Sequence, residues 1–345
     1  MEINKVMHAA LKALSYPDLD VKKTYKIKRR LEGIRSAQLS PEKNLFQDWR
    51  VPFGKTSVPV RLFFPNDKEV LEPPVILFFH GGGWVVGDIN SYTKVCASMA
   101  QILESVVISV DYRLAPEHKF PAAPEDCYHV AKTLFCDGFP FPAKPEEITL
   151  MGDSAGGNLA AVVSQMARDR GEFEVKQQIL LYPATFNDHS PASPFPSVVE
   201  NGTDYLLTSK RVCDYMELYQ SSPEDRQNPY FAPLLAEDFT NQPRTLILTA
   251  EFDPLRDEGE AYGAELQRAG NDVTVVRIAD GLHGYFSLPP RFEAVQESYR
   301  WIQQFLKGGE PLCVMQSGAG WKTLQRYFRP PQAEKIQRFS VSPVN

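Results

Sequence analysis

The sequence is poor in the features that mark disulfide-stabilised, metal-binding and redox proteins. Its 345 residues include only five cysteines, an odd number, and these show neither the spacing of metal ligands nor that of a redox pair. They are scattered along the chain at Cys96, Cys127, Cys136, Cys213 and Cys313. Reduced thiols in a cytoplasmic protein are the simplest interpretation.

Long apolar runs and an excess of basic charge are also missing. The stretch 1–14 carries charged residues such as Glu2 and Lys5, so it lacks the apolar core of a signal peptide, and no run approaches transmembrane length. With 43 acidic and 37 basic residues, the formal net charge of −6 gives no reason to expect nucleic acid or an anionic membrane surface as a partner. A small, roughly neutral substrate fits this composition better.

Short apolar runs that alternate with helix-length segments organise the rest of the chain. The runs predict buried strands at 75–79, 105–110, 148–151, 178–182, 245–249 and 273–278. Segments of helix length lie at 91–104, 124–137, 155–170, 257–269 and 291–306. This alternation predicts an α/β protein with a mostly parallel central sheet and helices on both faces. Upstream, 46–51 and 58–64 flank Gly54 and predict an antiparallel hairpin at the sheet edge.

Two segments interrupt this alternation and predict a helical cap over one end of the sheet. The first, 1–45, starts with apolar residues at helical spacing and continues into a basic stretch. The second, 186–239, is rich in proline and aromatic residues and is too long for an ordinary connection. The alternative to a cap is that both segments are surface insertions without a functional role. The main domain would then comprise 46–185 and 240–308, followed by a C-terminal extension over 309–345.

The strongest local motif is G-D-S-A-G at residues 152–156, which matches G-x-S-x-G. It lies between a predicted strand and a predicted helix, which is the context that this motif requires. The tight turn projects the serine oxygen away from the sheet, and the flanking glycines let neighbouring backbone approach without a clashing Cβ. The start of the helix adds unpaired N–H groups. The motif predicts Ser154 as a nucleophile, and a solvated serine in a glycine-rich turn is the alternative.

A second glycine-rich motif, H-G-G-G-W at residues 80–84, follows another predicted strand. Backbone N–H groups fixed where an oxyanion will form stabilise the transition state of acyl transfer by about 3 to 4 kcal/mol each. We expect the N–H groups of Gly82, Gly83 and Ala155 to form such an oxyanion hole. A phosphate-binding loop is the alternative, but neither glycine cluster matches the nucleotide-binding patterns. His80 is expected to brace the loop by hydrogen bonding.

A serine hydroxyl is a weak nucleophile at neutral pH, so a base must accept its proton and a carboxylate must orient that base. In this class of fold the chain order is serine, then acid, then histidine. His283 follows the last predicted strand, and no other histidine occurs after His189. We therefore predict that His283 is the general base.

The choice of the acid is less direct, because several carboxylates follow the same pair of strands. Asp253 lies in the loop just past the strand 245–249 and is the predicted acid. Glu251, Asp257 and Asp280 are competitors nearby in the sequence. Asp257 fits better as a cap of the helix that follows.

Together, five motifs resemble those of the hormone-sensitive-lipase-like group of α/β-hydrolases, which includes bacterial short-chain carboxylesterases. The motifs are H-G-G-G-W (80–84), D-Y-R-L-A-P-E (111–117), G-D-S-A-G-G-N (152–158), D-P-L-R-D (253–257) and H-G (283–284). The resemblance covers about 46–306 and implies an α/β-hydrolase fold, a cap and serine carboxylesterase activity. It implies a triad of Ser154, Asp253 and His283 and the oxyanion hole named above. It implies no metal and no organic cofactor.

A cap would enclose the substrate, and its aromatic residues are candidate walls of an apolar pocket. The candidates are Trp84, Phe186, Tyr205, Tyr215 and Tyr219, and the core of the cap itself is the alternative place for them. An enclosed pocket favours short- to medium-chain acyl esters over emulsified triglyceride. Deacetylation of sugar esters or arylamides would use the same machinery. A non-catalytic small-molecule receptor on the same fold is a further alternative, against which the complete triad argues.

The extension 309–345 is unusual for the group that the chain resembles. Aromatic residues lie there among basic ones, and include Trp321, Tyr327 and Phe328. We expect the extension to pack on the enzyme's own surface or on a second subunit. In the second case the protein would be a homodimer. A flexible tail is the alternative.

Overall fold

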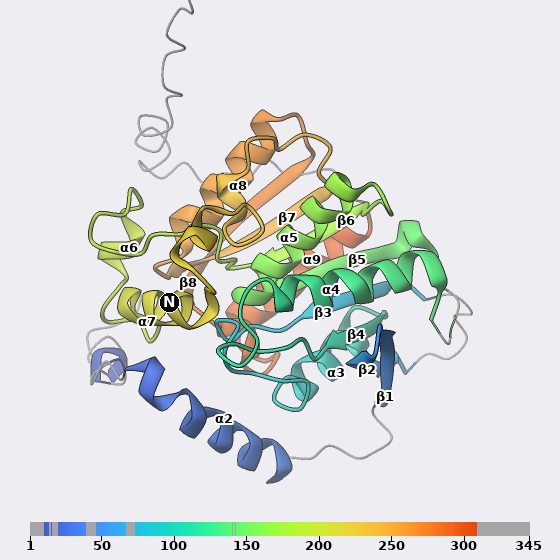
Figure 1. The fold of residues 1–345 in the computed structure, drawn as a ribbon, viewed down its shortest axis with the longest axis horizontal. Coiled ribbons are helices and arrows are strands. Elements are labelled where there is room, and N and C mark those ends of the chain that lie inside the picture. Colours follow the sequence, from blue (N-terminus) through green and yellow to red (C-terminus); the bar gives the residue numbers. More distant parts are fainter. Residues whose placement is uncertain are drawn as a thin grey trace, which may run out of the picture. The chain divides into compact units, whose positions relative to one another are not determined.

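The computed structural model describes residues 10–13, 15, 20–38, 46–66, 73–139, 141 and 143–308, which include a single sheet of eight strands. The sheet order is β1-β2-β4-β3-β5-β6-β7-β8 (Figure 1). The strands are β1 (Gln47–Phe53), β2 (Thr56–Phe63), β3 (Val75–Phe79), β4 (Val106–Val110), β5 (Ile148–Asp153), β6 (Gln177–Leu181), β7 (Arg244–Phe252) and β8 (Val273–Leu282). The hairpin β1–β2 is antiparallel and β2 pairs antiparallel with β4, whereas β3 to β8 run parallel.

The sequence pattern explains why the sheet is buried in its middle and exposed at the β1 edge. Every residue of β3 and β4 is buried, and both strands are continuous apolar runs, as expected for parallel strands covered on both faces. Most residues of β1 are exposed, which fits its place at the edge. The predicted hairpin and mostly parallel sheet are therefore confirmed.

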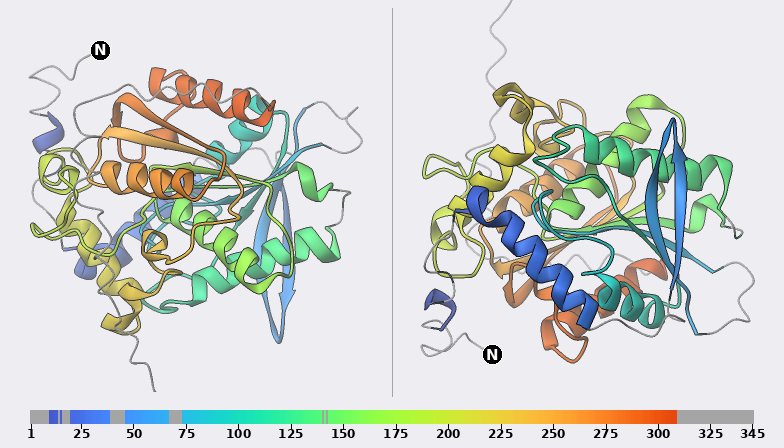
Figure 2. Two further views of the ribbon diagram at one scale, coloured as in Figure 1. Left: turned by 90° about the horizontal axis from the view of Figure 1, so that it is seen from above. Right: turned by 60° about the horizontal axis from the view of Figure 1, so that its bottom comes forward.

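Helices cover both faces of the sheet (Figure 2). They are α3 (Thr93–Ile102), α4 (Ala122–Lys132), α5 (Ala155–Arg170), α8 (Arg256–Arg268) and α9 (Glu293–Leu306). Helices α3 and α9 share one hydrophobic core with the sheet, which includes Phe78, Met99 and Ile302. Helix α4 packs on α5, and α5 and α8 both pack on the sheet. The predicted helix 124–137 changes at Thr133 into a π-helical turn that ends at Asp137.

The two interrupting segments contain helices that contact each other. Helix α2 (Val21–Gln38) packs on α7 (Ser209–Tyr219), and α6 (Ser197–Glu200) is a single short turn. The backbone N–H of Val21 donates to Asp214 Oδ2 on α7 at 3.2 Å. The N-terminal residues 1–9 and the extension 309–345 lie outside the described residues. No helix within the described ranges combines the length and the apolar character needed to cross a membrane.

Candidate active site

Ser154 lies at the junction where β5 ends and α5 begins, and its backbone is strained. Its φ of 55° and ψ of −119° are rare for a residue with a side chain. The turn is tight enough that a Cβ at Gly152 would lie 2.2 Å from the carbonyl oxygen of Gly156, and one at Gly156 would lie 1.9 Å from that of Phe79. Only glycine fits at these two positions, and the result is a serine held at the carboxyl edge of the sheet.

The structure brings Ser154, His283 and Asp253 together in one hydrogen-bonded chain. Ser154 Oγ lies 2.8 Å from His283 Nε2, and His283 Nδ1 lies 2.7 Å from Asp253 Oδ2. The three residues follow β5, β8 and β7, whose carboxyl ends meet at one edge of the sheet. The Asp253 side chain is completely buried and the imidazole of His283 is 12% exposed. Asp253 Oδ1 also accepts a hydrogen bond from the N–H of Leu255, which fixes the carboxylate plane.

The competing carboxylates contact other groups. Glu251 Oε2 accepts a hydrogen bond from the backbone N–H of Asp280 at 2.8 Å. Asp257 Oδ2 accepts one from the N–H of Ser197, also at 2.8 Å. The prediction that Asp257 caps α8 is wrong, because the helix begins one residue earlier, at Arg256, and its N-cap position is Leu255, whose side chain makes no capping hydrogen bond.

The glycine loop after β3 presents backbone N–H groups next to this chain of residues. Gly82 has a φ of 121° and Gly83 a φ of 60°. A Cβ at Gly82 would lie 2.0 Å from the carbonyl oxygen of Val86, so this position also requires glycine. Within the described part of the chain, the N–H groups of Gly82, Gly83 and Ala155 donate to no acceptor. Such N–H groups can bind an oxyanion.

Asp153 holds this loop against the nucleophile turn, a role that the sequence interpretation missed. Its carboxylate accepts hydrogen bonds from the N–H of Gly81 at 2.7 Å and from the hydroxyl of Tyr92 at 3.0 Å. Burial raises the pKa of Asp153 from 3.8 to about 6, although these hydrogen bonds and the nearby His283 partly oppose the rise. The only sequence signal for this role was its place as the second residue of the G-x-S-x-G motif.

His80 braces the same loop from inside, as the sequence predicted. Its Nδ1–H can donate to the carbonyl oxygen of Gly81 at 2.8 Å, and its ring stacks on Tyr112 with 4.3 Å between centroids. The hydroxyl of Tyr112, from the D-Y-R-L-A-P-E motif, donates to the carbonyl oxygen of His80 at 2.7 Å. Burial lowers the pKa of His80 from 6.5 to about 4, so the ring is neutral at neutral pH.

Three of the aromatic residues considered for the pocket lie at the glycine loop. The ring of Tyr215 on α7 rests directly on Gly83, where a Cβ would come within 2.4 Å of its Cγ atom. Trp84 is only 2% exposed and stacks on Tyr219, with 4.4 Å between ring centroids and 1° between planes. Trp84 and Tyr219 therefore form part of an aromatic core beneath the loop.

The other two candidates lie further along the 186–239 segment. Tyr205 stacks on Phe252, the residue before Asp253, with 4.9 Å between centroids. Phe186 packs edge-to-face on Phe195 and lines a surface hollow of about 450 Å³. None of the three residues in the hydrogen-bonded chain lines that hollow. Among the described residues, no cluster of three or more His, Cys, Asp or Glu side chains is placed to hold a metal ion.

Known proteins with similar sequences and structures include several esterases. Residues 76–287 match a family described by its alpha/beta hydrolase fold. Esterase LipI of Mycobacterium tuberculosis is 36% identical over 262 residues, which cover 75% of this chain and 80% of that protein. An arylesterase of Saccharolobus solfataricus is 33% identical over 244 residues, or 70% of this chain and 78% of that protein.

A solved structure supports the same relationship. The hyperthermophilic esterase from the archaeon Pyrobaculum calidifontis has 36% sequence identity and a TM-score of 0.78, and the match covers 89% of this chain and 99% of that one. The residues 76–287 that match the family include all of β3 but its first residue, the nucleophile turn and the loop that carries His283. This chain belongs to the α/β-hydrolase family, which confirms the resemblance seen in its motifs.

Proposed function

We propose that this protein is a serine carboxylesterase that hydrolyses short- to medium-chain acyl esters through an acyl-enzyme on Ser154. One observation carries the proposal. The hydrogen-bonded chain from Ser154 through His283 to Asp253, with distances of 2.8 and 2.7 Å, lies beside a loop of backbone N–H groups without acceptors in the described structure. This is the arrangement that acyl transfer through a serine requires.

In the first half of the reaction, Ser154 Oγ attacks the ester carbonyl carbon while His283 Nε2 accepts the hydroxyl proton. The carbonyl oxygen becomes an oxyanion and is bound by the N–H groups of Gly82, Gly83 and Ala155, at about 3 to 4 kcal/mol each. The protonated His283 then donates its proton to the alcohol oxygen as the C–O bond breaks. The alcohol leaves and an acyl-enzyme remains.

In the second half, water takes the place of the alcohol. His283 accepts a proton from the water, whose oxygen attacks the acyl carbon, and the same N–H groups bind the second oxyanion. The proton returns to Ser154 Oγ as the acid leaves. Asp253 accepts the Nδ1–H of His283 throughout, so that Nε2 faces the serine, and its buried charge stabilises the imidazolium.

We further propose that α2 and the segment 186–239 form the cap of this site. Tyr215 rests on Gly83, and Arg29 of α2 donates to the carbonyl oxygens of Val85 and Ala115 at 2.7 Å each. These contacts support an enclosed site, which would favour small acyl groups. We also propose a cytoplasmic location, which is the usual one for a protein whose few cysteines show no pairing pattern.

The proposal is tested with a chromogenic ester series on the wild type and on Ser154→Ala. We expect the substitution to lower kcat by roughly 10⁴- to 10⁶-fold and to abolish labelling by an organophosphonate. Ser57→Ala on the exposed β1–β2 hairpin serves as the control and should behave as the wild type. Equal activity in the wild type and Ser154→Ala would remove the catalytic assignment, and faster hydrolysis of long-chain emulsions than of butyrate esters would remove the chain-length preference.

A further inference from the structure

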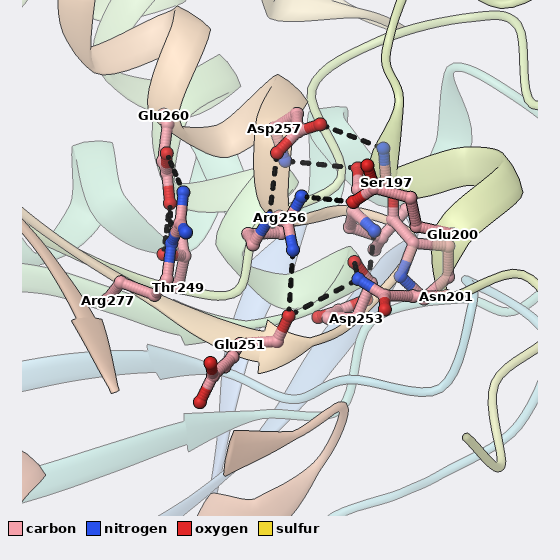
Figure 3. Close-up of polar contacts among 12 residues, drawn as sticks. Ser197, Glu200, Asn201, Thr249, Glu251, Asp253, Arg256, Asp257, Glu260 and Arg277 are labelled. Carbon is pink, nitrogen blue, oxygen red and sulfur yellow. Dashed lines mark hydrogen bonds and ion pairs between the residues drawn. The ribbon is translucent and has the colours of Figure 1, made fainter. Parts of the chain in front are cut away.

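A polar network links the two loops that carry the proposed acid and base, and Figure 3 shows the part of it around Glu251, Asn201 and Asp253. Glu251 is the second-last residue of β7, two positions before Asp253. Asp280 lies near the end of β8, three positions before His283. The hydrogen bond from the N–H of Asp280 to Glu251 Oε2 therefore joins the two loops directly.

An irregularity in the sheet explains why this bond is needed. Along β7 and β8 the register is regular up to the pair Ala250 and Ile278, but the next pair is Phe252 and Leu282. The strand β8 thus bulges by two residues, and Asp280 within the bulge has a φ of 53°, in the left-handed region. A bulge takes backbone N–H groups out of the regular ladder, and the part-buried N–H of Asp280 is thereby left without a ladder acceptor. The Glu251 carboxylate accepts its hydrogen bond instead.

The acid loop is held from the other side by the 186–239 segment. Asn201, which directly follows α6 and is only 4% exposed, donates from its side-chain amide to the carbonyl oxygens of both Glu251 and Asp253, at 3.2 Å each. Arg256 Nη1 donates to the carbonyl oxygen of Glu251 as well, at 3.2 Å. The backbone on both sides of Asp253 is thereby fixed by side chains from outside its own loop (Figure 3).

Ser197 and Asp257 form a second link between the same elements. The N–H of Ser197 donates to Asp257 Oδ2, and the N–H of Asp257 donates back to Ser197 Oγ at 3.2 Å. Ser197 Oγ in turn donates to the carbonyl oxygen of Pro254 at 2.8 Å. All these bonds connect α6 to the start of α8 and to the loop of Asp253.

We infer that Glu251 and Asn201 are positioning residues for the hydrolytic reaction, which hold the Asp253 and His283 loops at the separation that lets the carboxylate orient the imidazole. The inference rests on the proposed function. Neither side chain hydrogen-bonds to the side chain of Ser154, His283 or Asp253, so both act through the backbone. A misplacement of about 1 Å in such an arrangement can cost about 10²-fold in rate.

The test compares Glu251→Ala with Glu251→Gln. The Gln side chain keeps an oxygen that can accept from the N–H of Asp280, whereas Ala removes it. For a butyrate ester we expect Glu251→Ala to lower kcat by about 10- to 100-fold with KM within about threefold of the wild type, and Glu251→Gln to restore kcat to within about threefold. Titration of reactive serine with an organophosphonate normalises each rate to the folded, competent enzyme.

Glu260→Ala provides the matched control. The carboxylate of Glu260 also bridges β7 and β8, because it accepts from Thr249 Oγ1 at 3.1 Å and from Arg277 at 2.8 Å, but it contacts neither loop (Figure 3). Its loss should lower the melting temperature and leave kcat unchanged. A kcat for Glu251→Ala equal to that of Glu260→Ala would overturn the inference for Glu251.

Asn201→Leu tests the second residue, because leucine has a similar volume but no hydrogen-bond donor. We expect a fall in kcat of about 10-fold or more with a small change in KM. Unchanged kcat in this variant would overturn the role of Asn201.

If Glu251→Ala does not fold, Glu251→Asp replaces it, because the shorter carboxylate cannot reach Asp280 and kcat must fall. A wild type without Ser154-dependent hydrolysis would instead contradict the proposed function.

Discussion

The residue next to the proposed nucleophile is a buried carboxylate with two opposing demands on it. Asp153 must accept hydrogen bonds from Gly81 and Tyr92 to hold the glycine loop, and these bonds favour its charged form. Its burial disfavours the charge and is the larger effect, so its pKa rises to about 6. The buried charge of Asp153 therefore lowers the stability of the protein at neutral pH, while its hydrogen bonds keep the glycine loop in place.

This balance predicts how the stability of the protein depends on pH. The native state holds the Asp153 proton to higher pH than the unfolded chain does, so the stability from this proton is complete below about pH 3.8 and is lost as the pH rises through about 6. Asp153→Asn cannot ionise. Between about pH 4.5 and about pH 7.5, its free energy of unfolding should therefore gain about 2 kcal/mol relative to that of the wild type. Urea unfolding of both proteins at the two pH values measures this, and a constant difference would contradict it.

The positions of single residues could be predicted from the sequence where a local motif determines the backbone. They could not be predicted where they depend on contacts between segments far apart in the sequence. That the side chains of Ser154, Asp253 and His283 meet could be predicted because each follows a strand of the same parallel sheet. The contacts of Glu251 with Asp280 and Asn201 could not, because they depend on the bulge in β8 and on a side chain about 50 residues away in the sequence. No local sequence pattern predicts the bulge or the contact made by Asn201.

Among the elements, α2 contacts the segment that follows the glycine loop through Arg29 and through Glu32, whose Oε2 accepts from the N–H of Gly87 at 3.3 Å. Arg29 donates to the carbonyl oxygens of Val85 and Ala115 and forms a bidentate pair with Glu117. The Glu117 side chain is 48% exposed, so the ion pair itself contributes little. The bonds to the two carbonyl oxygens are half-buried and charge-assisted, and such bonds contribute about 1.5 to 3 kcal/mol each.

Removal of the Arg29 side chain should therefore loosen α2 without unfolding the sheet. For Arg29→Ala we expect KM for a butyrate ester to rise by about tenfold and trypsin to cleave within residues 20–38 several times faster. The reason is the loss of two hydrogen bonds that contribute about 1.5 to 3 kcal/mol each. Lys23→Ala is the matched control, since Lys23 is a neighbouring basic residue whose side chain is 83% exposed and it also removes one trypsin site. Equal KM and cleavage rates in the two variants would show that Arg29 does not hold the helix.

The boundaries of the elements were predictable to different degrees, for a physical reason. The predicted limits of β3 and α5 match the structure, because an apolar run defines the first and the G-x-S-x-G turn begins the second. The strands β7 and β8 extend past their predicted ends, to Phe252 and Leu282. Their last residues include Glu251 and Asp280. Because these side chains are polar, the apolar pattern that predicts a strand ends before the strand itself does.

For the whole molecule, charge is distributed unevenly between the described domain and the extension 309–345. The extension contains five basic and two acidic residues, so the rest of the chain carries a net charge of about −9 within the total of −6. A basic, aromatic segment and an acidic body attract each other, either within one chain or between two copies. The prediction that the extension packs on the enzyme or on a second subunit rests on this complementarity.

Truncation after Gly309 separates these alternatives. Every residue of the proposed site lies between Gly82 and His283, so we expect kcat and KM for a butyrate ester to stay within about twofold of the full-length values, as for changes remote from the site. If the extension joins two copies, light scattering will show the mass fall from that of a dimer to that of a monomer, and high salt will weaken the full-length dimer because its contacts are ionic. If it packs on its own chain, the mass will fall only by that of the removed residues and the melting temperature will drop. A mass change of that size with an unchanged melting temperature would contradict both forms of packing.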